Sequence, residues 1–185
     1  VMLYTISENG RRTVIGFLQK GDYFGFVVRD VHSYFAQTVG ACVIRSISRA
    51  RLWREIREHH RAAEKFLSLE GNALENARKH IVLLTRKTPI ERVSMFLLDM
   101  AARQGGDGNF ARGVRLPMTR TDIADYLGLV VETVCRCLTS LKDRGMISME
   151  TRGQIEILDG ERLQRYALGE ERIDPTGESL INEGM

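Results

Sequence analysis

The run Leu116–Ile147 constrains the fold of this 185-residue chain most, because a glycine separates two short amphipathic stretches within it. Thr119 and Asp122 form a start of the capping-box type for the first stretch, and Gly128 supplies the left-handed residue that commonly ends a helix. The second stretch begins within a few residues and ends before Gly145. A short helix, a turn containing glycine and a second helix predict a helix-turn-helix.

The second predicted helix has two faces of different character. Its apolar residues share the side that should pack inside the domain: Val134, Cys137, Leu138 and Leu141. The opposite side carries residues at helical spacing near the helix N-terminus, where a recognition helix places its base-reading side chains: Glu132, Cys135, Arg136 and Thr139. Arginine can donate two hydrogen bonds to guanine, and glutamate can accept one from cytosine. This face therefore predicts DNA binding. The alternative is a plain surface ion pair between Glu132 and Arg136, worth only about 0.3–0.5 kcal/mol.

Two short strands are expected after the helix-turn-helix, over Met146–Glu150 and Gln154–Leu158. They would form the β-wing of a winged helix, with Arg152 at the tip able to reach a DNA phosphate. Thr119, Arg120 and Thr133 are the other predicted phosphate contacts. Asp159 caps a last predicted helix, Gly160–Leu168. The acidic tail over residues 169–185 has little to bury and is predicted to be disordered.

A long helix, Arg61–Lys87, is predicted upstream, ending before Thr88-Pro89. Its spacing of four and three defines a heptad seam, apolar except at Glu70: Ala63, Leu67, Glu70, Leu74, Ala77, Ile81 and Leu84. A second apolar face holds Phe66, Leu69, Ala73 and Leu83. One face would cover a neighbouring domain and the other would meet a second copy, so we expect a homodimer. The alternative is a single amphipathic helix inside a monomer. Thr88 and Pro89 then begin the next predicted helix, Ile90–Arg103.

The first part of the chain has a period of two and predicts β structure. Val1–Ile6 and Thr13–Leu18 are strand-like around a turn at Glu8-Asn9-Gly10, and Phe35–Ile47 predicts further short strands. A short helix is expected at Arg51–Glu58. Because a lone hairpin needs more strands to be stable, we expect preceding strands outside this sequence. A very small β domain is the alternative.

Composition narrows the function classes. The net charge of +3 permits a nucleic-acid partner without requiring one. No apolar run is long enough for a membrane span, and we do not expect the first residues given to act as a secretory signal. Three scattered cysteines are typical of a reducing cytoplasm rather than a disulfide framework. The histidines show no metal-ligand spacing with the cysteines, and no nucleophile–base pair or phosphate-binding glycine loop is found. We therefore expect neither an enzyme nor a cofactor or metal site.

The chain resembles the CRP/FNR superfamily of bacterial regulators over nearly its whole length to Leu168. Gly21–Gly25 is similar to the family's Gly-Asp-x-[Phe/Ile]-Gly turn, and Glu132–Arg136 is similar to the Glu-x-x-Ser-Arg reading motif of the FNR and FixK branches. Asp122–Leu129 followed by Glu132-Thr133-Val134 is especially similar to FixK-type proteins, which govern microaerobic and nitrogen-fixation-related genes.

The resemblance implies an α+β fold in four parts. These are a partial β-roll, sensor-type domain (1–60), a dimerisation helix (61–87), a C-terminal winged helix-turn-helix (88–168) and the acidic tail (169–185). It also implies a homodimer on a palindrome of double-stranded DNA with half-sites like TTGAT or TTGAC. Arg136 would lie on the G·C pair with Glu132 beside it, and Val131 would touch a thymine methyl group. We expect a transcription activator, with RNA polymerase as a further partner.

Three positions depart from the family pattern. Val130 replaces the usual Ser or Thr N-cap of the second helix, which costs about 1 kcal/mol on the usual capping scale. Tyr34-Phe35 stands where the cyclic-nucleotide branch has an Arg-Ser or Arg-Thr pair, so cyclic AMP is not expected. Cys42 lies three residues before Arg45, the position that would match a cluster ligand, so no iron–sulfur cluster is expected. A ligand- or cluster-gated sensor of the same superfamily remains the alternative.

Cys135 stands where the motif has Ser, on the predicted DNA face. A helix N-terminus and the adjacent Arg136 favour a thiolate, and oxidation would add polarity and then negative charge against DNA. One hypothesis is that oxidation of Cys135 switches DNA binding off; the other is that the residue is small and passive. Cys137 should be an inert core thiol. A winged-helix module that binds protein instead of DNA is a further alternative.

Overall fold

The computed structural model describes residues 1–185 except 28–30, 106–112, 152, 174–178 and 182–185. It divides into two compact units, unit 1 from Val1 to Val82 and unit 2 from Leu83 to Met185. Each unit has its own sheets and helices, and each is described below by itself. In the described part of the chain, no helix combines the length and the apolar character needed to cross a bilayer.

Unit 1 begins with an antiparallel sheet of three strands in the order β2-β1-β3. The strands are β1 (Met2–Ile6), β2 (Arg12–Phe17) and β3 (Phe35–Gln37). Gly10, with φ 78°, closes the predicted turn between β1 and β2. The prediction of several strands over Phe35–Ile47 is wrong after residue 37. Residues 38–48 form no strand, and Val43 there is 93% exposed.

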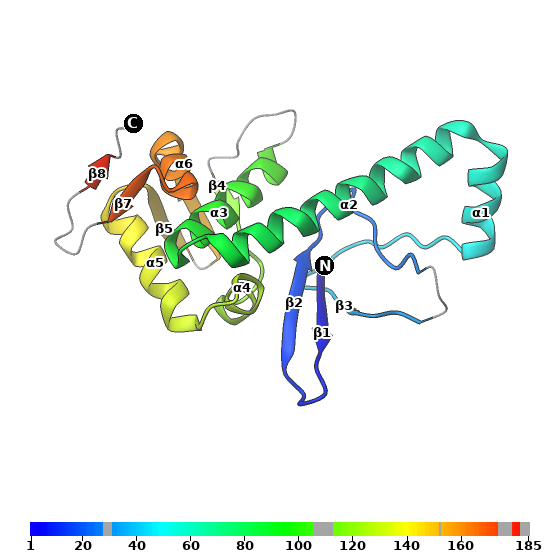
Figure 1. Ribbon diagram of the computed structural model, residues 1–185, viewed down its shortest axis with the longest axis horizontal. Coiled ribbons are helices and arrows are strands. Elements are labelled where there is room, and N and C mark those ends of the chain that lie inside the picture. The colour runs from blue at the N-terminus through cyan, green and yellow to red at the C-terminus, as the bar shows by residue number, and fades with distance from the viewer. Residues whose placement is uncertain (28–30, 106–112, 152, 174–178, 182–185) are drawn as a thin grey trace. The chain divides into compact units, whose positions relative to one another are not determined.

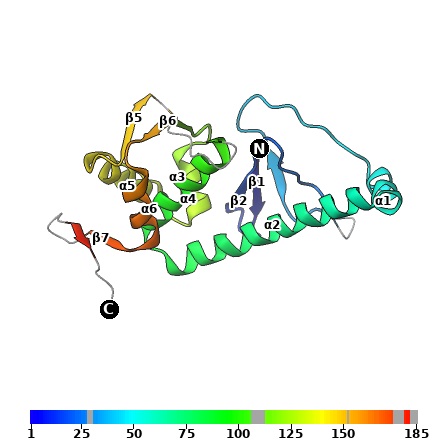
Figure 2. The same ribbon diagram turned by 90° about the horizontal axis from the view of Figure 1, so that it is seen from above.

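Two helices follow in unit 1: α1 (Arg49–Glu58) and α2 (His60–Arg86), the longest helix in Figures 1 and 2. The last residues of α2, from Leu83 on, belong to unit 2. α1 starts two residues before the predicted bound because the Ser48 side chain accepts a hydrogen bond from the Arg51 amide. α2 lies within one residue of its predicted bounds at each end.

An aromatic cluster packs α2 against the segment that follows β2. Phe66 of α2 makes edge-on contacts with Tyr23 and Phe26, and Trp53 of α1 contacts Phe26 in the same way. The Tyr23 hydroxyl donates to Glu70 at 2.6 Å. Burial and the Glu70 carboxylate raise the pKa of Tyr23. Glu70, the polar residue of the predicted heptad seam, is therefore hydrogen-bonded within unit 1.

Unit 2 contains four helices and a three-stranded sheet in its described residues, and two further strands in its tail. The elements run α3 (Pro89–Gly105), β4 (Gly113–Arg115), α4 (Arg120–Leu127), α5 (Val131–Asp143), β5 (Ile147–Thr151), β6 (Gln154–Ile157) and α6 (Gly160–Leu168). The sheet is antiparallel with the order β4-β6-β5. α3 contacts both α5 and α6 (Figures 1 and 2). The side chains at its centre are almost fully buried, among them Leu97, Leu127, Leu141, Ile155 and Leu163.

The helix and strand bounds in unit 2 follow local signals in the sequence. Pro89 is the first residue of α3, as its fixed φ favours. The Asp159 side chain accepts from the Arg162 amide at the start of α6, and Gly169 ends that helix with φ 80°. β5 and β6 each lie within one residue of the predicted wing strands.

Two short segments of the tail after Gly169 form strands in the described residues. Residues Glu171–Ile173 form β7, which pairs antiparallel with β8 (Ser179–Ile181). The Glu171 side chain is only 4% exposed, and its two carboxylate oxygens lie 3.0 Å from Arg162 Nε and 3.4 Å from Arg165 Nε. The carboxylate of Glu171, one of the acidic residues of this tail, is neutralised by two guanidinium groups of α6. Residues 174–178 and 182–185 of the predicted tail lie outside the described residues.

Candidate nucleic-acid interface

α4 is fixed at both ends by the signals found in the sequence. The Asp122 amide donates to Thr119 Oγ1 at 3.1 Å, and the Thr119 amide donates to Asp122 Oδ2 at 2.9 Å, which completes a capping box. Gly128 adopts the left-handed conformation with φ 63° and ends the helix. The Leu129 amide then donates to the Ala124 carbonyl at 2.9 Å. These bonds hold a tight turn between α4 and α5, as the helix-turn-helix prediction requires.

α5 shows the two faces that the sequence predicts. Its inner face is buried, with exposures of 0–8%: Val134, Cys137, Leu138 and Leu141. Four residues of its outer face are exposed: Glu132, Cys135, Arg136 and Thr139. Val131 and Thr133 are half-buried. Val130 is the N-cap and makes no side-chain cap hydrogen bond, so the first amides of α5 remain available to an acceptor from outside the helix.

The Arg136 side chain is held by Thr133 rather than by Glu132. Arg136 Nη2 donates to Thr133 Oγ1 at 3.2 Å, and no ion pair joins Glu132 to Arg136 in the described part of the chain. The alternative arrangement, a surface ion pair between Glu132 and Arg136, is therefore not formed in these described residues. Both charged groups face solvent, and each can turn to a base edge without breaking a bond to the other.

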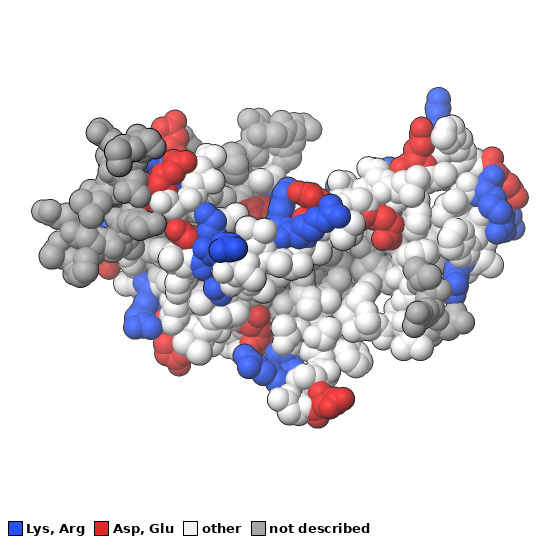
Figure 3. Space-filling view, in the orientation of Figure 1, with Lys and Arg blue, Asp and Glu red and all other residues white. Residues whose placement is uncertain are grey.

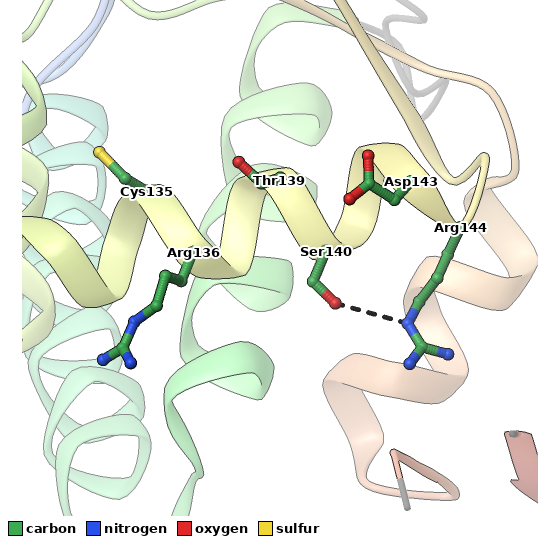
Figure 4. A pocket seen from close by; sticks show the side chains of 6 residues that line it. All are labelled: Cys135, Arg136, Thr139, Ser140, Asp143 and Arg144. Atoms are coloured by element: carbon green, nitrogen blue, oxygen red, sulfur yellow. Dashed lines mark hydrogen bonds between the residues drawn. The ribbon is translucent and has the colours of Figure 1, made fainter. Parts of the chain in front are cut away.

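A groove of about 550 Å³ runs along the outer side of α5. In Figure 4, Cys135, Thr139 and Asp143 point to one side of the helix axis and Arg136, Ser140 and Arg144 point to the other. Arg144 Nε lies 3.4 Å from Ser140 Oγ, and Arg144 Nη1 lies 3.4 Å from the hydroxyl of Tyr166. Sequence reasoning missed Ser140 and Arg144, although the sequence shows them four and eight residues after Arg136, on the same side of the helix.

The predicted phosphate contacts have different surroundings. Thr119 is engaged in the capping box through its hydroxyl, and Thr133 accepts from Arg136. Arg120 is half-buried, with Nη2 4.0 Å from Met149 Sδ. Burial lowers the pKa of Arg120, and the nearby Cys135 sulfur acts in the opposite direction. Arg152 lies outside the described residues.

The turn between the two wing strands is joined to the residue that follows β4. The Leu116 amide donates to the Gly153 carbonyl at 2.7 Å. Gly153 has φ 80°, and a Cβ there would lie 3.1 Å from the Leu116 carbonyl oxygen, so only glycine allows this approach without strain. The wing strands are thus placed beside the helix-turn-helix.

The thiols of α5 differ as predicted in exposure: Cys135 is exposed and Cys137 is buried. Burial raises the pKa of Cys137, which keeps it a protonated core thiol. Among the residues that the structure describes, no cluster of three or more His, Cys, Asp or Glu side chains has the geometry of a metal site. Figure 3 shows positive and negative side chains interspersed on the face drawn, so charge alone does not define a binding surface.

Comparisons with known proteins agree on the kind of molecule. Residues 91–166 match the family model described as a Crp-like helix-turn-helix domain. The chain is 36% identical over 164 residues to the nitrogen fixation regulation protein FixK of Rhizobium meliloti (strain 1021), covering 89% of this chain and 72% of FixK. It is 31% identical over 165 residues to the transcriptional activatory protein AadR of Rhodopseudomonas palustris, covering 89% and 69% of the two chains.

A solved structure supports the same relationship. FixK2 from Bradyrhizobium japonicum matches with a TM-score of 0.74 at 30% identity, covering 89% of this chain and 81% of that one. The similarity therefore extends over both units and is not confined to the helix-turn-helix.

Proposed function

Because this chain belongs to the CRP/FNR family of bacterial transcription regulators, in its FixK-like branch, we propose that it reads a palindromic operator as a homodimer. Members of this family are DNA-binding regulators and not enzymes. The observation that carries the proposal is the outer face of α5. Its N-terminal half presents Glu132, Cys135 and Arg136 to solvent while the opposite face is buried in the domain.

The base contacts follow from the chemistry of that face. Arg136 donates two hydrogen bonds to O6 and N7 of guanine, and Glu132 accepts from the amino group of cytosine. Val131, the first residue of α5, touches a thymine methyl group. These preferences suit half-sites of the TTGAT or TTGAC type. Thr119, Arg120, Thr133 and Arg152 are proposed to contact phosphates and fix the register.

The homodimer is proposed on the seam of α2. Three of its leucine and isoleucine side chains are strongly exposed, namely Leu67 at 70%, Leu74 at 53% and Ile81 at 60%. Ala63 and Leu84 are half-buried and Ala77 is exposed, so the seam presents an apolar surface for a second copy of the helix. A twofold dimer with one recognition helix per subunit matches a palindromic site.

The first experiment is fluorescence anisotropy with a duplex carrying a TTGAT palindrome and with a scrambled duplex of the same composition. Arg136→Ala should lose discrimination at the G·C pair by about 1–3 kcal/mol, which is roughly 5- to 150-fold. Lys142→Ala, an exposed cation later on α5, is the matched control and should shift affinity for all duplexes alike. Equal affinity of the native chain for both duplexes would exclude operator reading and favour a protein-interaction module.

The dimer is tested separately by light scattering. Leu74→Glu places a charge on the seam and should convert the dimer to a monomer, with loss of palindrome binding but not of the fold. A native chain that is monomeric at micromolar concentration while binding the palindrome tightly would contradict the proposed assembly.

Activation through RNA polymerase is part of the proposal, supported by the description of AadR as an activatory protein.

We also propose that peroxide switches DNA binding off at Cys135. The exposed Cys135 sulfur attacks peroxide, forming a sulfenic acid and releasing water, and the added oxygen meets the DNA face. Cys135→Ser should bind the palindrome equally well before and after peroxide. If the native chain and Cys135→Ser lose binding to the same degree, the switch does not lie at this residue.

A further inference from the structure

One arginine joins three segments of unit 2 where the end of α2 meets the helix-turn-helix. Arg92 of α3 donates from Nη2 to the Leu84 carbonyl at 2.7 Å. It donates from Nε to the Lys87 carbonyl and from Nη1 to the Leu127 carbonyl, both at 2.9 Å. Leu84 lies in the last turn of α2, Lys87 follows that helix, and Leu127 is the last residue of α4.

The acceptors of Arg92 are carbonyls at helix C-terminal ends, which lack partners within their own helices. They also carry the negative end of the helix dipole, so two helices direct partial negative charge at one guanidinium. A guanidinium presents its donors in fixed directions within one plane. Arg92 therefore fixes the angle between the end of α2 and the end of α4 and does more than neutralise them.

The turn of the helix-turn-helix packs on the same junction. A Cβ added at Gly128 would lie 3.3 Å from Leu84 Cδ2 and 3.5 Å from Arg92 Nη1. Leu84 is also the last residue of the proposed dimer seam. The end of the seam, the start of α3 and the turn before α5 thus meet around the Arg92 side chain.

We propose that Arg92 is a positioning residue that ties the recognition helix to the end of the dimer helix and so sets which half-site spacing the dimer accepts. The inference rests on the proposed homodimer and operator. Two half-sites of a palindrome lie about one helical turn apart, and both recognition helices reach them only if each is held at a set angle to the shared dimer helix. Arg92 touches no DNA in this scheme and acts through the backbone of α2 and α4.

The test compares duplexes that differ only in spacing. One carries the TTGAT palindrome, two have one or two base pairs inserted between the half-sites, and one has a single half-site. Arg92→Met keeps an unbranched stem but removes every donor, and Arg92→Lys keeps charge without the planar fork. Arg103→Met is the matched control, because Arg103 lies on the same helix and pairs with Asp99 at 2.9 Å, away from the junction.

The native chain and Arg103→Met should bind the inserted duplexes about tenfold more weakly than the native palindrome, a penalty similar to that of one mismatched base pair. Arg92→Met should lose most of that preference while binding the single half-site with unchanged affinity. Arg92→Lys should fall between the two. Circular dichroism shows whether each variant is folded, and Arg92→Lys supplies the comparison if Arg92→Met is not.

Two outcomes overturn the inference in different ways. If the Arg92 variants weaken binding to all duplexes by one factor and keep the native spacing preference, Arg92 only stabilises the domain. If the native chain binds the palindrome no better than the single half-site or the scrambled duplex, the proposed function fails first and the inference fails with it.

Discussion

The two units of the chain differ in how many of their apolar side chains are buried. Among the described residues, the buried hydrophobic side chains of unit 1 are Met2, Val14 and Phe17, and all others lie in unit 2. The large exposed hydrophobic side chains show the reverse distribution. Unit 2 has three, Val130, Leu158 and Leu168, whereas the remainder belong to unit 1 and include the α2 seam.

This difference fits the roles proposed for the two units, base reading by unit 2 and dimer formation by unit 1. Base reading requires side chains held within a fraction of an ångström, and a packed core behind α5 provides that rigidity. Unit 1 presents apolar surface that a second copy of the chain can cover, as the seam would in a dimer. Unit 2 should therefore be stable by itself, whereas unit 1 should depend on contacts that cover its apolar surface, from the expected preceding strands or from a second copy of the chain.

The largest expected effect comes from separating the units. A fragment of residues 83–185 should keep the far-ultraviolet circular dichroism and amide protection of its part of the full chain, because its core is complete within it. A fragment of residues 1–82 should show little protection, since three buried side chains supply only a small hydrophobic gain. Strong amide protection of the 1–82 fragment, or none in the 83–185 fragment, would contradict the expected difference in stability between the two units.

A second test replaces one leucine in each unit. Leu141→Ala, at a fully buried position of α5, should destabilise unit 2 by about 2–5 kcal/mol through lost burial and the cavity that remains. Leu67→Ala, at a position 70% exposed, should leave amide protection in unit 2 unchanged. Urea titration followed by hydrogen exchange resolves the two units. Similar losses of protection in α5 for both variants would mean that the units unfold together.

A third test concerns the turn inside unit 2 and expects a smaller effect. Gly128→Ala forces an L side chain to φ 63° and against Leu84 and Arg92, and should cost about 2 kcal/mol. Gly145→Ala, at φ 71° with nothing within 4 Å of the new Cβ, is the matched control and should cost about 1 kcal/mol. Thermal unfolding measures both. An equal loss in both variants would show that the contacts at Gly128 add nothing to the backbone strain.

The sequence predicted those parts of the fold that depend on local chemistry. The capping box of Thr119 and Asp122, the left-handed Gly128 and the two faces of α5 involve residues within one or two helical turns of each other. The residue types at these positions are therefore enough to predict the helix ends and the buried face. The strand prediction failed at residues 38–47 because β-branched composition indicates a strand only where a partner strand is available.

The parts that the sequence did not predict depend on tertiary contacts. The acceptors of Arg92 are backbone carbonyls, which every residue has, so no residue type marks them. The burial of Glu171 depends on two arginines of α6. Composition alone does not distinguish this glutamate from the other acidic residues of the tail. Thr133 and Glu132 lie three and four residues before Arg136, so either could be its partner. Only the side-chain geometry shows that Arg136 bonds to Thr133.

The smallest expected effect lies at the two N-caps of the helix-turn-helix. Thr119 caps α4 with its hydroxyl, whereas Val130 offers α5 no acceptor and is 62% exposed. Val130→Ser should therefore stabilise unit 2 by up to about 1 kcal/mol, and Thr119→Ala should destabilise it by a similar amount. Denaturant midpoints measure both changes.

Val130→Thr, which keeps the β-branched shape, separates the gain of a hydroxyl from the loss of a methyl group. If neither hydroxyl variant raises the midpoint, the open amides of α5 are already satisfied by solvent. The absence of a cap would then carry no energetic consequence in the free protein and would matter only when a phosphate approaches those amides.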